Sequence, residues 1–284
     1  MTVCKTRAEL RKIVEEAKKN GKSIGLVPTM GALHEGHGSL IAAARPENDL
    51  VIVSIFVNPT QFAPNEDLDA YPRTLDTDVA LAESLGADII FAPTAKEMYP
   101  SCDDTWVEVT GNITKVLCGK SRPTHFRGVT TVVTKLFLIA CPDRAYFGQK
   151  DAQQVHIIRR MVKDLFFPLE LRILPIIREH DGLAKSSRNV YLSPEERKAA
   201  LVLSQSLSAA EEAVRGGERS GARLVDSVRA QIACEPMSNI EYVELHTLPD
   251  LTPVTEPLNG AYLLAVAVRF GTTRLIDNTV LEVF

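Results

Sequence analysis

The sequence of 284 residues has no excess of basic side chains. Its 32 lysines and arginines are outnumbered by 36 aspartates and glutamates, which gives a formal net charge of −4. Proteins that bind nucleic acids usually carry a basic surface, so we expect no nucleic-acid partner. An anionic small molecule would therefore have to be bound by a local group of donors.

Long apolar runs are also missing. No uninterrupted stretch approaches the ~20 apolar residues of a membrane-spanning helix. Residues 1–22 are charged, with apolar residues at helical spacing, and lack the apolar core of a signal peptide. We therefore expect an amphipathic helix near the N-terminus and no membrane partner.

Cysteines are few and irregularly spaced. They are Cys4, Cys102, Cys118, Cys141 and Cys234. An odd number without regular spacing is typical of reduced thiols rather than of a disulfide framework, so we expect a cytoplasmic protein.

The first part of the chain has the pattern of an α/β protein. With 45% hydrophobic and 24% charged residues, the sequence can bury a full core. Strand-like runs occur at 23–27, 49–57, 87–91, 145–147 and 169–174, and the run at 49–57 suits a strand buried on both faces. Helical patterns are found at 75–86, 129–140 and 155–166. Residues 92–127 look irregular, apart from a short strand expected at 105–109.

From residue 194 the pattern changes. Two helices are predicted, at 194–215 and 222–233, and three strand-like runs follow at 240–246, 261–269 and 279–284. Helices followed by antiparallel strands are typical of a small α+β domain. We therefore predict an α/β domain with a parallel sheet over residues 1–175 and a smaller α+β domain over residues 176–284.

The segment 26–40 carries the strongest functional signal. An apolar strand gives way to a turn containing Gly31 and Gly36, and a helix follows. The backbone N–H groups at a helix N-terminus favour an anion. His34 and His37 lie three residues apart at this point, so both imidazoles can face one side and donate hydrogen bonds to a polyphosphate.

The histidine pair by itself is also compatible with less specific roles. The two residues could be ordinary polar members of a surface turn, which is the commoner case for an isolated pair. A zinc site would need further ligands, and none stands out. The glycines match neither the P-loop nor the dinucleotide fingerprint.

Polar residues also follow the second predicted strand. Asn58 and Gln61 come where open α/β sheets place ligands, and their amides could recognise hydroxyl or carboxylate groups. A plain turn would use similar residue types. Asp76 and Asp78, in the first turn of the next helix, could complement the helix dipole or hold a magnesium ion that accompanies a nucleotide.

Three later segments offer cationic or amide side chains. Residues 121–128 contain two arginines and a histidine, which could line an anion-binding mouth or simply be solvated. Residues 148–154 repeat the sequence of strand, glycine turn and helix, with a lysine and several glutamines. Residues 175–193 form a long polar connection that suits either a phosphate loop able to close over a ligand or an interdomain linker.

Together these motifs resemble one family over nearly the whole chain, and they occur in the right order. They are P-T-M-G-A-L-H-E-G-H at 28–37, S-I-F-V-N-P-T-Q-F at 54–62, Y-P-R-T at 71–74, R-P-T-H-F-R-G-V-T-T-V-V at 122–133, F-G-Q-K-D-A-Q-Q at 147–154, R-E-H-D-G-L-A-K-S-S-R-N at 178–189 and G-T-T-R-L-I-D-N at 271–278. The chain is similar to the pantothenate synthetases, also called pantoate–β-alanine ligases. These belong with the aminoacyl-tRNA-synthetase-like nucleotidyltransferases, whose H-I-G-H element resembles residues 34–37 and whose K-M-S-K-S loop resembles the region around Ser186.

The resemblance implies a Rossmann-like fold and an ATP-dependent ligase of pantothenate biosynthesis. Pantoate and ATP would give pantoyl-adenylate and pyrophosphate, and β-alanine would then release pantothenate and AMP. ATP would be the co-substrate, Mg²⁺ would accompany it, and the enzyme would be a homodimer. Attack of a carboxylate on the α-phosphate needs positioning and charge neutralisation more than a covalent nucleophile.

The motif match also implies roles for individual residues. The implied catalytic residues are His34, His37 (as proton donor), Lys150 and Arg188. The implied ATP contacts are Met30, Gly31, His34, Gly36, His37, Gly148, Gln149, Lys150, Asp151, Ile177, Lys185, Ser186, Ser187 and Arg188. The implied substrate contacts are Gln61, Gln154, Asn58, Met30, Val133, Arg122 and Tyr71, and the implied magnesium ligand is Asp78.

Some positions depart from the family pattern. Gly38 replaces a large apolar residue, Lys185 stands where relatives carry methionine or leucine, and Ala152 fills a position that is often aromatic. The acid matched to the magnesium site falls at Thr77, next to Asp78. Since no group that does chemistry is lost, we expect an active enzyme. The alternatives are a phosphopantetheine or nicotinamide-nucleotide adenylyltransferase of the same superfamily, and a nucleotide-binding regulator without catalysis.

Overall fold

The structure is a computed structural model that describes residues 1–63, 66–100 and 105–283. The chain divides into two compact units. The first comprises residues 1–110, 122–149 and 157–175, and the second comprises 111–121, 150–156 and the chain from 176 onward. Two short segments before residue 157 thus group with the C-terminal part of the chain.

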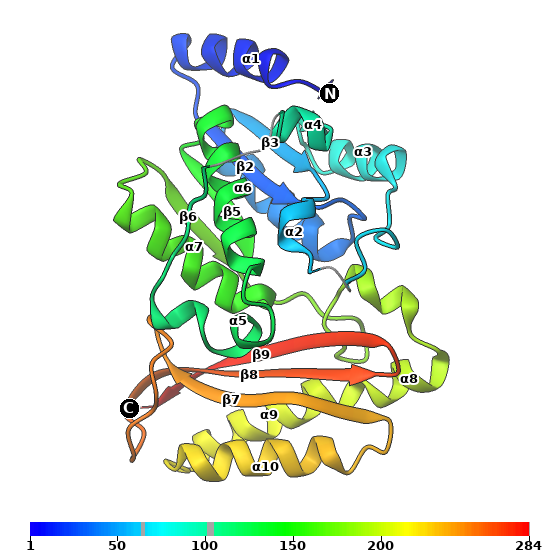
Figure 1. Ribbon diagram of the computed structural model, residues 1–284, viewed down its shortest axis with the longest axis vertical. Coiled ribbons are helices and arrows are strands. Elements are labelled where there is room, and N and C mark those ends of the chain that lie inside the picture. Colours follow the sequence, from blue (N-terminus) through cyan, green and yellow to red (C-terminus); the bar gives the residue numbers. More distant parts are fainter. Residues whose placement is uncertain (64–65, 101–104, 284) are drawn as a thin grey trace. The chain divides into compact units, whose positions relative to one another are not determined.

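A six-stranded sheet forms the centre of the first unit (Figure 1). Its order is β1 (Thr2–Cys4), β4 (Ile89–Phe91), β3 (Leu50–Ile55), β2 (Ile24–Thr29), β5 (Arg144–Gly148) and β6 (Glu170–Leu174). All neighbouring strands are parallel. The parallel α/β sheet predicted from the sequence is confirmed. Strand β1 was not predicted, because a strand of three residues is too short to show a periodic pattern.

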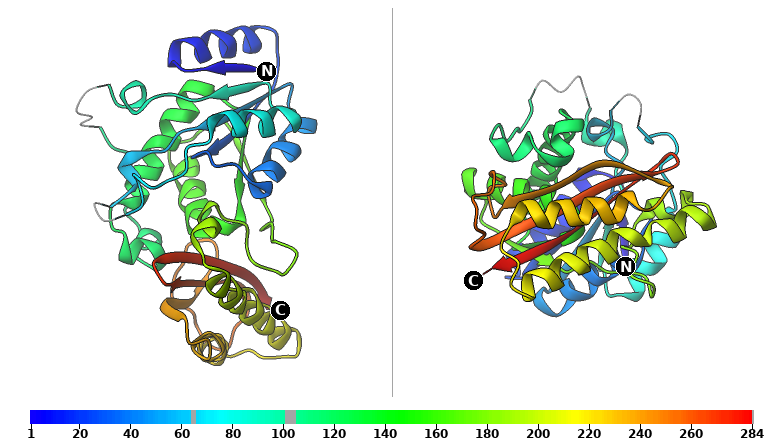
Figure 2. Two further views of the ribbon diagram at one scale, coloured as in Figure 1. Left: turned by 90° about the vertical axis from the view of Figure 1, so that its right-hand side faces the viewer. Right: turned by 90° about the horizontal axis from the view of Figure 1, so that it is seen from below.

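Helices cover both faces of this sheet. They are α1 (Arg7–Lys19), α2 (Glu35–Ala44), α3 (Leu75–Ser84), α4 (Ala95–Met98), α6 (His125–Ala140) and α7 (Ala152–Asp164), whose first residues belong to the second unit. Short 3₁₀ turns are η1 (Arg45–Glu47) and η2 (Pro59–Gln61). Val27 and Val53 pack with Ile41 of α2 and Ala82 of α3. Successive strand residues alternate between faces, and α6 lies on the opposite face of the sheet from α2 (Figure 2).

Two local predictions in this unit need correction. The strand expected at 105–109 is absent, because Val107 is bound by side chains instead of by a neighbouring strand: its N–H donates to Thr131 Oγ1 at 3.1 Å, and its carbonyl accepts from Thr130 Oγ1 at 2.5 Å. Helix α2 begins at Glu35, so Gly36, which the sequence assigned to the turn, lies within the helix.

The second unit consists of an antiparallel sheet and a layer of helices. The strands are β7 (Ser238–Thr247), β8 (Gly260–Phe270) and β9 (Thr273–Val283), in that order. The helices are α5 (Leu117–Ser121), α8 (Pro194–Ala199), α9 (Leu201–Arg215) and α10 (Gly221–Ala233), with 3₁₀ turns η3 (Asn112–Thr114), η4 (Gln149–Asp151) and η5 (Ser187–Tyr191) around them. The predicted α+β character is confirmed, although the helix predicted at 194–215 is divided at Ala200.

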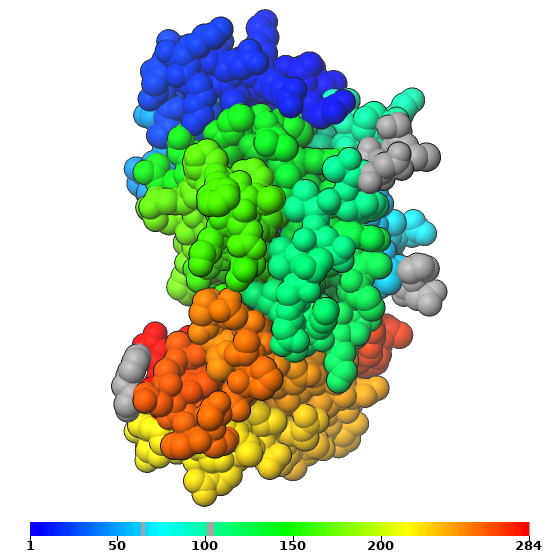
Figure 3. Space-filling model, turned by 60° about the vertical axis from the view of Figure 1, so that its left-hand side comes forward, coloured from blue at the N-terminus to red at the C-terminus, as the bar shows by residue number. Residues whose placement is uncertain are grey.

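The core of this unit lies between α9, α10 and the sheet. Leu207 of α9 and Val228 of α10 are 1% exposed and pack with Leu264 and Phe270 of β8, which are fully buried. In Figure 3 the atoms of α10 (yellow) lie directly against those of the following segment (orange). In the described part of the chain, no helix is both long and apolar enough to cross a membrane.

Candidate active site

The turn after β2 is fixed by the strand beside it. Thr29 Oγ1 donates to the Ser54 carbonyl of β3 at 2.7 Å and accepts from the Gly31 N–H at 3.1 Å. Gly31 and Ala32 then adopt left-handed backbone conformations, with φ of 84° and 49°. The chain therefore reverses within a few residues at the carboxyl end of β2, next to the carboxyl end of β3.

His34 is the N-cap of α2. Its Nδ1 accepts a hydrogen bond from the Gly36 N–H at 3.1 Å, and the His34 N–H donates to His37 Nδ1 at 3.4 Å. The two histidines thus form a capping box, in which His34 stands where serine is usual and His37 where glutamate is usual. Their rings lie 4.2 Å apart, centroid to centroid.

This arrangement assigns the protons of both imidazoles. A ring nitrogen that accepts a hydrogen bond carries no proton, so in His34 and His37 the proton resides on Nε2. Each ring then presents an N–H donor at its far end, beside the first turn of a helix. The sequence predicted imidazole donors at this helix N-terminus, and in the structure each Nδ1 accepts a hydrogen bond from the backbone of the same turn.

Asp78 of α3 is buried beside this turn, with 2% exposure. Its carboxylate accepts the N–H groups of Ala32 at 2.9 Å and Leu33 at 2.8 Å, and the Thr74 hydroxyl at 3.1 Å. Thr74 is the N-cap residue of α3, but it makes no side-chain capping bond and its hydroxyl binds Asp78 instead. The carboxylate therefore faces the turn, and its predicted contact with magnesium stays a prediction.

Asn58, after β3, is an internal residue. It is 1% exposed, and its Oδ1 accepts from Tyr99 at 2.8 Å and Thr60 at 2.9 Å. Its Nδ2 donates to Gln61 Oε1 at 3.1 Å and to the Gly128 carbonyl at 3.2 Å. These four bonds use the full capacity of the amide within the protein, and the recognition of a substrate hydroxyl or carboxylate by Asn58 stays a prediction. A place in the pocket wall stays a prediction.

Gln61 is oriented by this network. Its Oε1 accepts from Asn58, and its Nε2 lies 3.0 Å from Met30 Sδ. Its carbonyl oxygen lies 2.8 Å from His125 Nδ1, which must carry a proton to donate, and 3.3 Å from Arg122 Nη2. Both the side chain and the main chain of Gln61 are therefore fixed by neighbours, which is how a specificity residue is preorganised.

Arg122 is a structural cation. It forms an ion pair with Glu66 in which both Nε and Nη2 lie 2.5 Å from carboxylate oxygens. Partial burial acts to raise the pKa of Glu66, but the hydrogen bonds and the positive charge of Arg122, together with the Ala63 N–H, outweigh burial and lower the pKa. The guanidinium charge of Arg122 is thus paired within the protein, and its predicted contact with substrate stays a prediction. The two remaining predicted substrate contacts of this unit, Tyr71 and Val133, are each 4% exposed.

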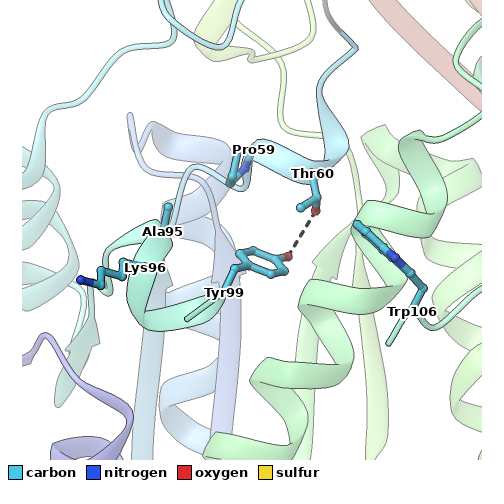
Figure 4. A pocket seen from close by; sticks show the side chains of 6 residues that line it. All are labelled: Pro59, Thr60, Ala95, Lys96, Tyr99 and Trp106. Carbon is cyan, nitrogen blue, oxygen red and sulfur yellow. Dashed lines mark hydrogen bonds between the residues drawn. The ribbon is translucent and has the colours of Figure 1, made fainter. Parts of the chain in front are cut away.

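A hollow lies beside Pro59 and Thr60, the first two residues of η2 (Figure 4). It is about 300 Å³ in volume, and its lining is Pro59, Thr60, Ala95, Lys96, Tyr99 and Trp106. The Tyr99 hydroxyl points toward Thr60 Oγ1, 3.2 Å away. None of the lining residues was predicted to bind ATP or substrate, so this hollow does not correspond to the predicted site.

In the second unit, the segment after Gln149 is held by amide contacts. The Lys150 carbonyl accepts from Asn278 Nδ2 at 2.9 Å. Gln153, which is 6% exposed, donates to the carbonyls of Ile113 at 2.8 Å and Val116 at 2.7 Å. The sequence singled out the glutamine pair but could not tell that Gln153 is the structural member, and the substrate contact of Gln154 stays a prediction.

The predicted phosphate loop has a fixed stem. Arg178 forms two hydrogen bonds with the buried Asp277, at 2.6 and 3.0 Å, and Arg197 binds both Glu179 and Asp181. The hydrogen bonds from Arg197 lower the pKa of Asp181, and they also lower that of Glu179 against the effect of burial. The carboxylates of Glu179 and Asp181, at the base of the loop, therefore stay ionised near neutral pH.

The tip of this loop holds the predicted ATP contacts. The Lys185 N–H donates to the Ile177 carbonyl at 2.9 Å, which closes the hairpin. Ser186 is the N-cap of η5, since its Oγ accepts the Arg188 N–H at 3.3 Å. Ser187 is the first residue of that turn. The ATP contacts of these residues, and those of Gly36, Gly148 and Asp151, stay predictions.

Taken together, the parallel sheet and the histidine-capped helix at its carboxyl edge have the form of a Rossmann-like nucleotidyltransferase fold. The family model described as Pantoate-beta-alanine ligase matches residues 2–280. The chain therefore belongs to the pantoate–β-alanine ligase family, whose members join pantoate to β-alanine.

Similar curated proteins and solved structures belong to the same family. The curated pantothenate synthetases of Acetivibrio thermocellus and Pelotomaculum thermopropionicum are each 56% identical to this chain, with 100% and 99% of both sequences covered. The crystal structure of pantothenate synthetase from Thermus thermophilus is similar with a TM-score of 0.92 and 46% identity, over 98% of this chain and 99% of that one. The Francisella tularensis pantoate-beta-alanine ligase, complexed with beta-gamma ATP and beta-alanine, gives a TM-score of 0.78 and 37% identity, over 98% and 97%.

These comparisons confirm the resemblance stated from the motifs. They give no support to an adenylyltransferase with another acceptor or to a regulator without catalysis, because the matched proteins are ligases over their whole length.

Proposed function

We propose that this chain condenses pantoate with β-alanine through a pantoyl-adenylate, with ATP as co-substrate and with AMP and pyrophosphate as products. The observation that carries the proposal is the capping arrangement of His34 and His37, which directs two Nε2–H donors beside a helix N-terminus. Negative charge develops on the phosphates as the pantoate carboxylate attacks the α-phosphate. Fixed N–H donors stabilise that charge without having to reorganise during the reaction.

Gln61 is the residue we propose for recognition of pantoate. An amide has two N–H donors and two acceptor lone pairs. Its contacts with Asn58 and Met30 use one of each, which leaves a donor and an acceptor for the hydroxyl or carboxylate of the substrate. The ligand-bound Francisella tularensis relative supports ATP and β-alanine as the other two substrates.

We propose that Lys150, Ser186, Ser187 and Arg188 contact the phosphates of ATP, as the motif resemblance implies. A lysine and an arginine supply charge, and hydroxyls and backbone N–H groups supply hydrogen bonds. The contact of Gln154 with pantoate and the gating role of the loop at 175–193 are proposals on the same basis.

The side chains that the structure describes do not form a ready-made magnesium site. Among the residues that the structure describes, no group of three or more histidine, cysteine, aspartate or glutamate side chains could hold a metal ion. Both oxygens of Asp78 accept backbone N–H groups. Magnesium that serves ATP usually keeps several waters and needs only one or two protein carboxylates. We propose that Mg²⁺ enters with the triphosphate.

A homodimer in the cytoplasm is also a proposal. Cys4 and Cys118 are buried free thiols, and Cys141 and Cys234 are exposed free thiols, which fits a reducing compartment. Light scattering of the purified protein would test the dimer, since a molar mass of one chain would contradict it.

The decisive test of the function is isotope exchange between pyrophosphate and ATP, with pantoate present and β-alanine absent. Exchange that requires pantoate would establish the adenylate half-reaction and identify the acid. Absence of exchange from folded protein that binds ATP would refute the proposed reaction. Omission of pantoate is the internal control.

A further inference from the structure

Asp78 is a carboxylate that the proposed chemistry does not use. It is 2% exposed, and the bonds from Ala32, Leu33 and Thr74 all come from uncharged donors. Burying a carboxylate is costly unless donors replace its water. Asp78 has those donors, and it also lies in the first turn of α3, where the helix dipole favours negative charge.

The donors belong to the turn that leads into His34. Ala32 has a φ of 49°, a left-handed conformation that costs a non-glycine residue about 1–3 kcal/mol. Such a conformation persists only where the surroundings fix it. Two charge-assisted hydrogen bonds, to the N–H groups of Ala32 and of the next residue, provide that restraint.

The space beside the turn is equally restricted. A Cβ atom added to Gly31 would lie 3.1 Å from Asp78 Oδ2 and 3.0 Å from Ile55 Cγ2. The carboxylate is therefore packed against the turn as well as bonded to it. His34, the N-cap residue of α2, follows Leu33 directly. A movement of Ala32 and Leu33 would therefore change the direction in which the two imidazoles point.

We propose that Asp78 is a positioning residue for the two histidines and not a ligand of magnesium. It acts through the turn: its two oxygens fix Ala32 and Leu33, the turn fixes His34 as the N-cap, and the N-cap contacts hold both rings with the proton on Nε2. The inference about catalysis rests on the proposed function, whereas the inference about the geometry of the rings does not.

The test uses two substitutions at this contact and one control. Asp78→Asn keeps the shape of the side chain but replaces one acceptor by an NH₂ group, which cannot accept from a backbone N–H. Thr74→Val removes the hydroxyl that supports Asp78. Glu83→Gln is the control, because Glu83 is an exposed acid near the other end of the same helix.

Two kinds of measurement are combined. The first is pantoate-dependent exchange of pyrophosphate with ATP, measured against the concentrations of pantoate and of Mg²⁺. The second is the ¹⁵N chemical shift of the imidazole nitrogens in the free protein, which reports the tautomer of each ring without any turnover. A thermal melt of each variant records whether the change is one of stability alone.

For Asp78→Asn we expect kcat to fall about 10- to 100-fold, the size of effect that a misplacement of about 1 Å produces. The KM for pantoate and the Mg²⁺ concentration for half-maximal exchange should not change. The imidazole shifts of His34 and His37 should move away from the Nε2–H tautomer. Thr74→Val should change kcat in the same direction by about 2- to 5-fold, and Glu83→Gln should match the parent protein.

Three results would overturn the inference. Asp78→Asn activity that returns to the parent value at high Mg²⁺ would make Asp78 a metal ligand. A lower melting temperature with unchanged kcat and unchanged imidazole shifts would make it a purely structural residue. If the parent protein shows no pantoate-dependent exchange, the proposed function fails, and unchanged imidazole shifts in Asp78→Asn would separately refute the positioning role.

Discussion

Gly128 sets the position of Gln61, and its replacement by alanine should weaken recognition of pantoate. Gly128 lies in α6, directly against the chain that carries Gln61. A Cβ atom at this position would lie 2.4 Å from the Thr60 carbonyl oxygen and 2.8 Å from Gln61 Cα. Both are backbone atoms, so no side-chain rotation can relieve the overlap.

The size of the effect follows from these distances. Ordinary contacts of a Cβ atom begin at 3.4 Å, so the segment at Thr60 and Gln61 must move by about 1 Å. Overpacking of this kind costs about 1–3 kcal/mol. Alanine in the middle of a helix recovers roughly 1 kcal/mol relative to glycine. We therefore expect a small loss of stability, but a displacement of Gln61 that lowers kcat/KM for pantoate about 10- to 100-fold.

The assay is the initial rate of pantoate-dependent exchange between pyrophosphate and ATP, at saturating ATP and varied pantoate. The KM for ATP should change much less, because the turn with His34 and His37 follows a different strand. Gly111→Ala is the control, since the nearest atom to its added Cβ would be Ile113 Cγ2 at 3.8 Å. Unchanged pantoate kinetics in folded Gly128→Ala protein would refute this reasoning.

Three further substitutions test other parts of the structure. His37→Ala removes an imidazole donor and should slow adenylate formation by about two orders of magnitude or more in single-turnover measurements, so near-normal turnover would contradict its role. Hydrogen bonds from Arg274 lower the pKa of Glu241 to about 2, so its stabilisation is present above the unfolded pKa of about 4.5 and is lost as the pH falls toward 2. The difference in melting temperature between the parent and Glu241→Gln should therefore be largest near pH 7 and shrink below pH 4.5. Gly38→Ala would place a Cβ 2.9 Å from Leu85 Cδ1, the end of a flexible side chain. The free energy of unfolding, measured with urea, should therefore stay within about 1 kcal/mol of the parent. A loss above about 2 kcal/mol would show that Leu85 cannot move.

Much of the fold could be predicted because its signals are local. The strands β2 to β5 are largely buried apolar runs bounded by polar residues, so hydrophobicity alone locates them, whereas β6 is an edge strand that is only partly buried. The antiparallel strands of the second unit were also found, but β9 begins at Thr273, six residues before its predicted start. Arg274, Asp277 and Asn278 interrupt the apolar pattern there, and the structure gives all three hydrogen-bond partners.

The sequence by itself determined the family and the histidine pair, because the motifs are contiguous and the spacing of His34 and His37 fixes their common face on α2. Only the tertiary structure decided what the polar residues around that pair do. The turn at Ala32 meets Asp78, Asn58 meets Tyr99, and Arg122 pairs with Glu66, across separations of 41 to 56 residues. Whether an amide, a carboxylate or a guanidinium recognises substrate or supports the chain depends on which partners satisfy it, and the folding of distant segments against one another supplies those partners.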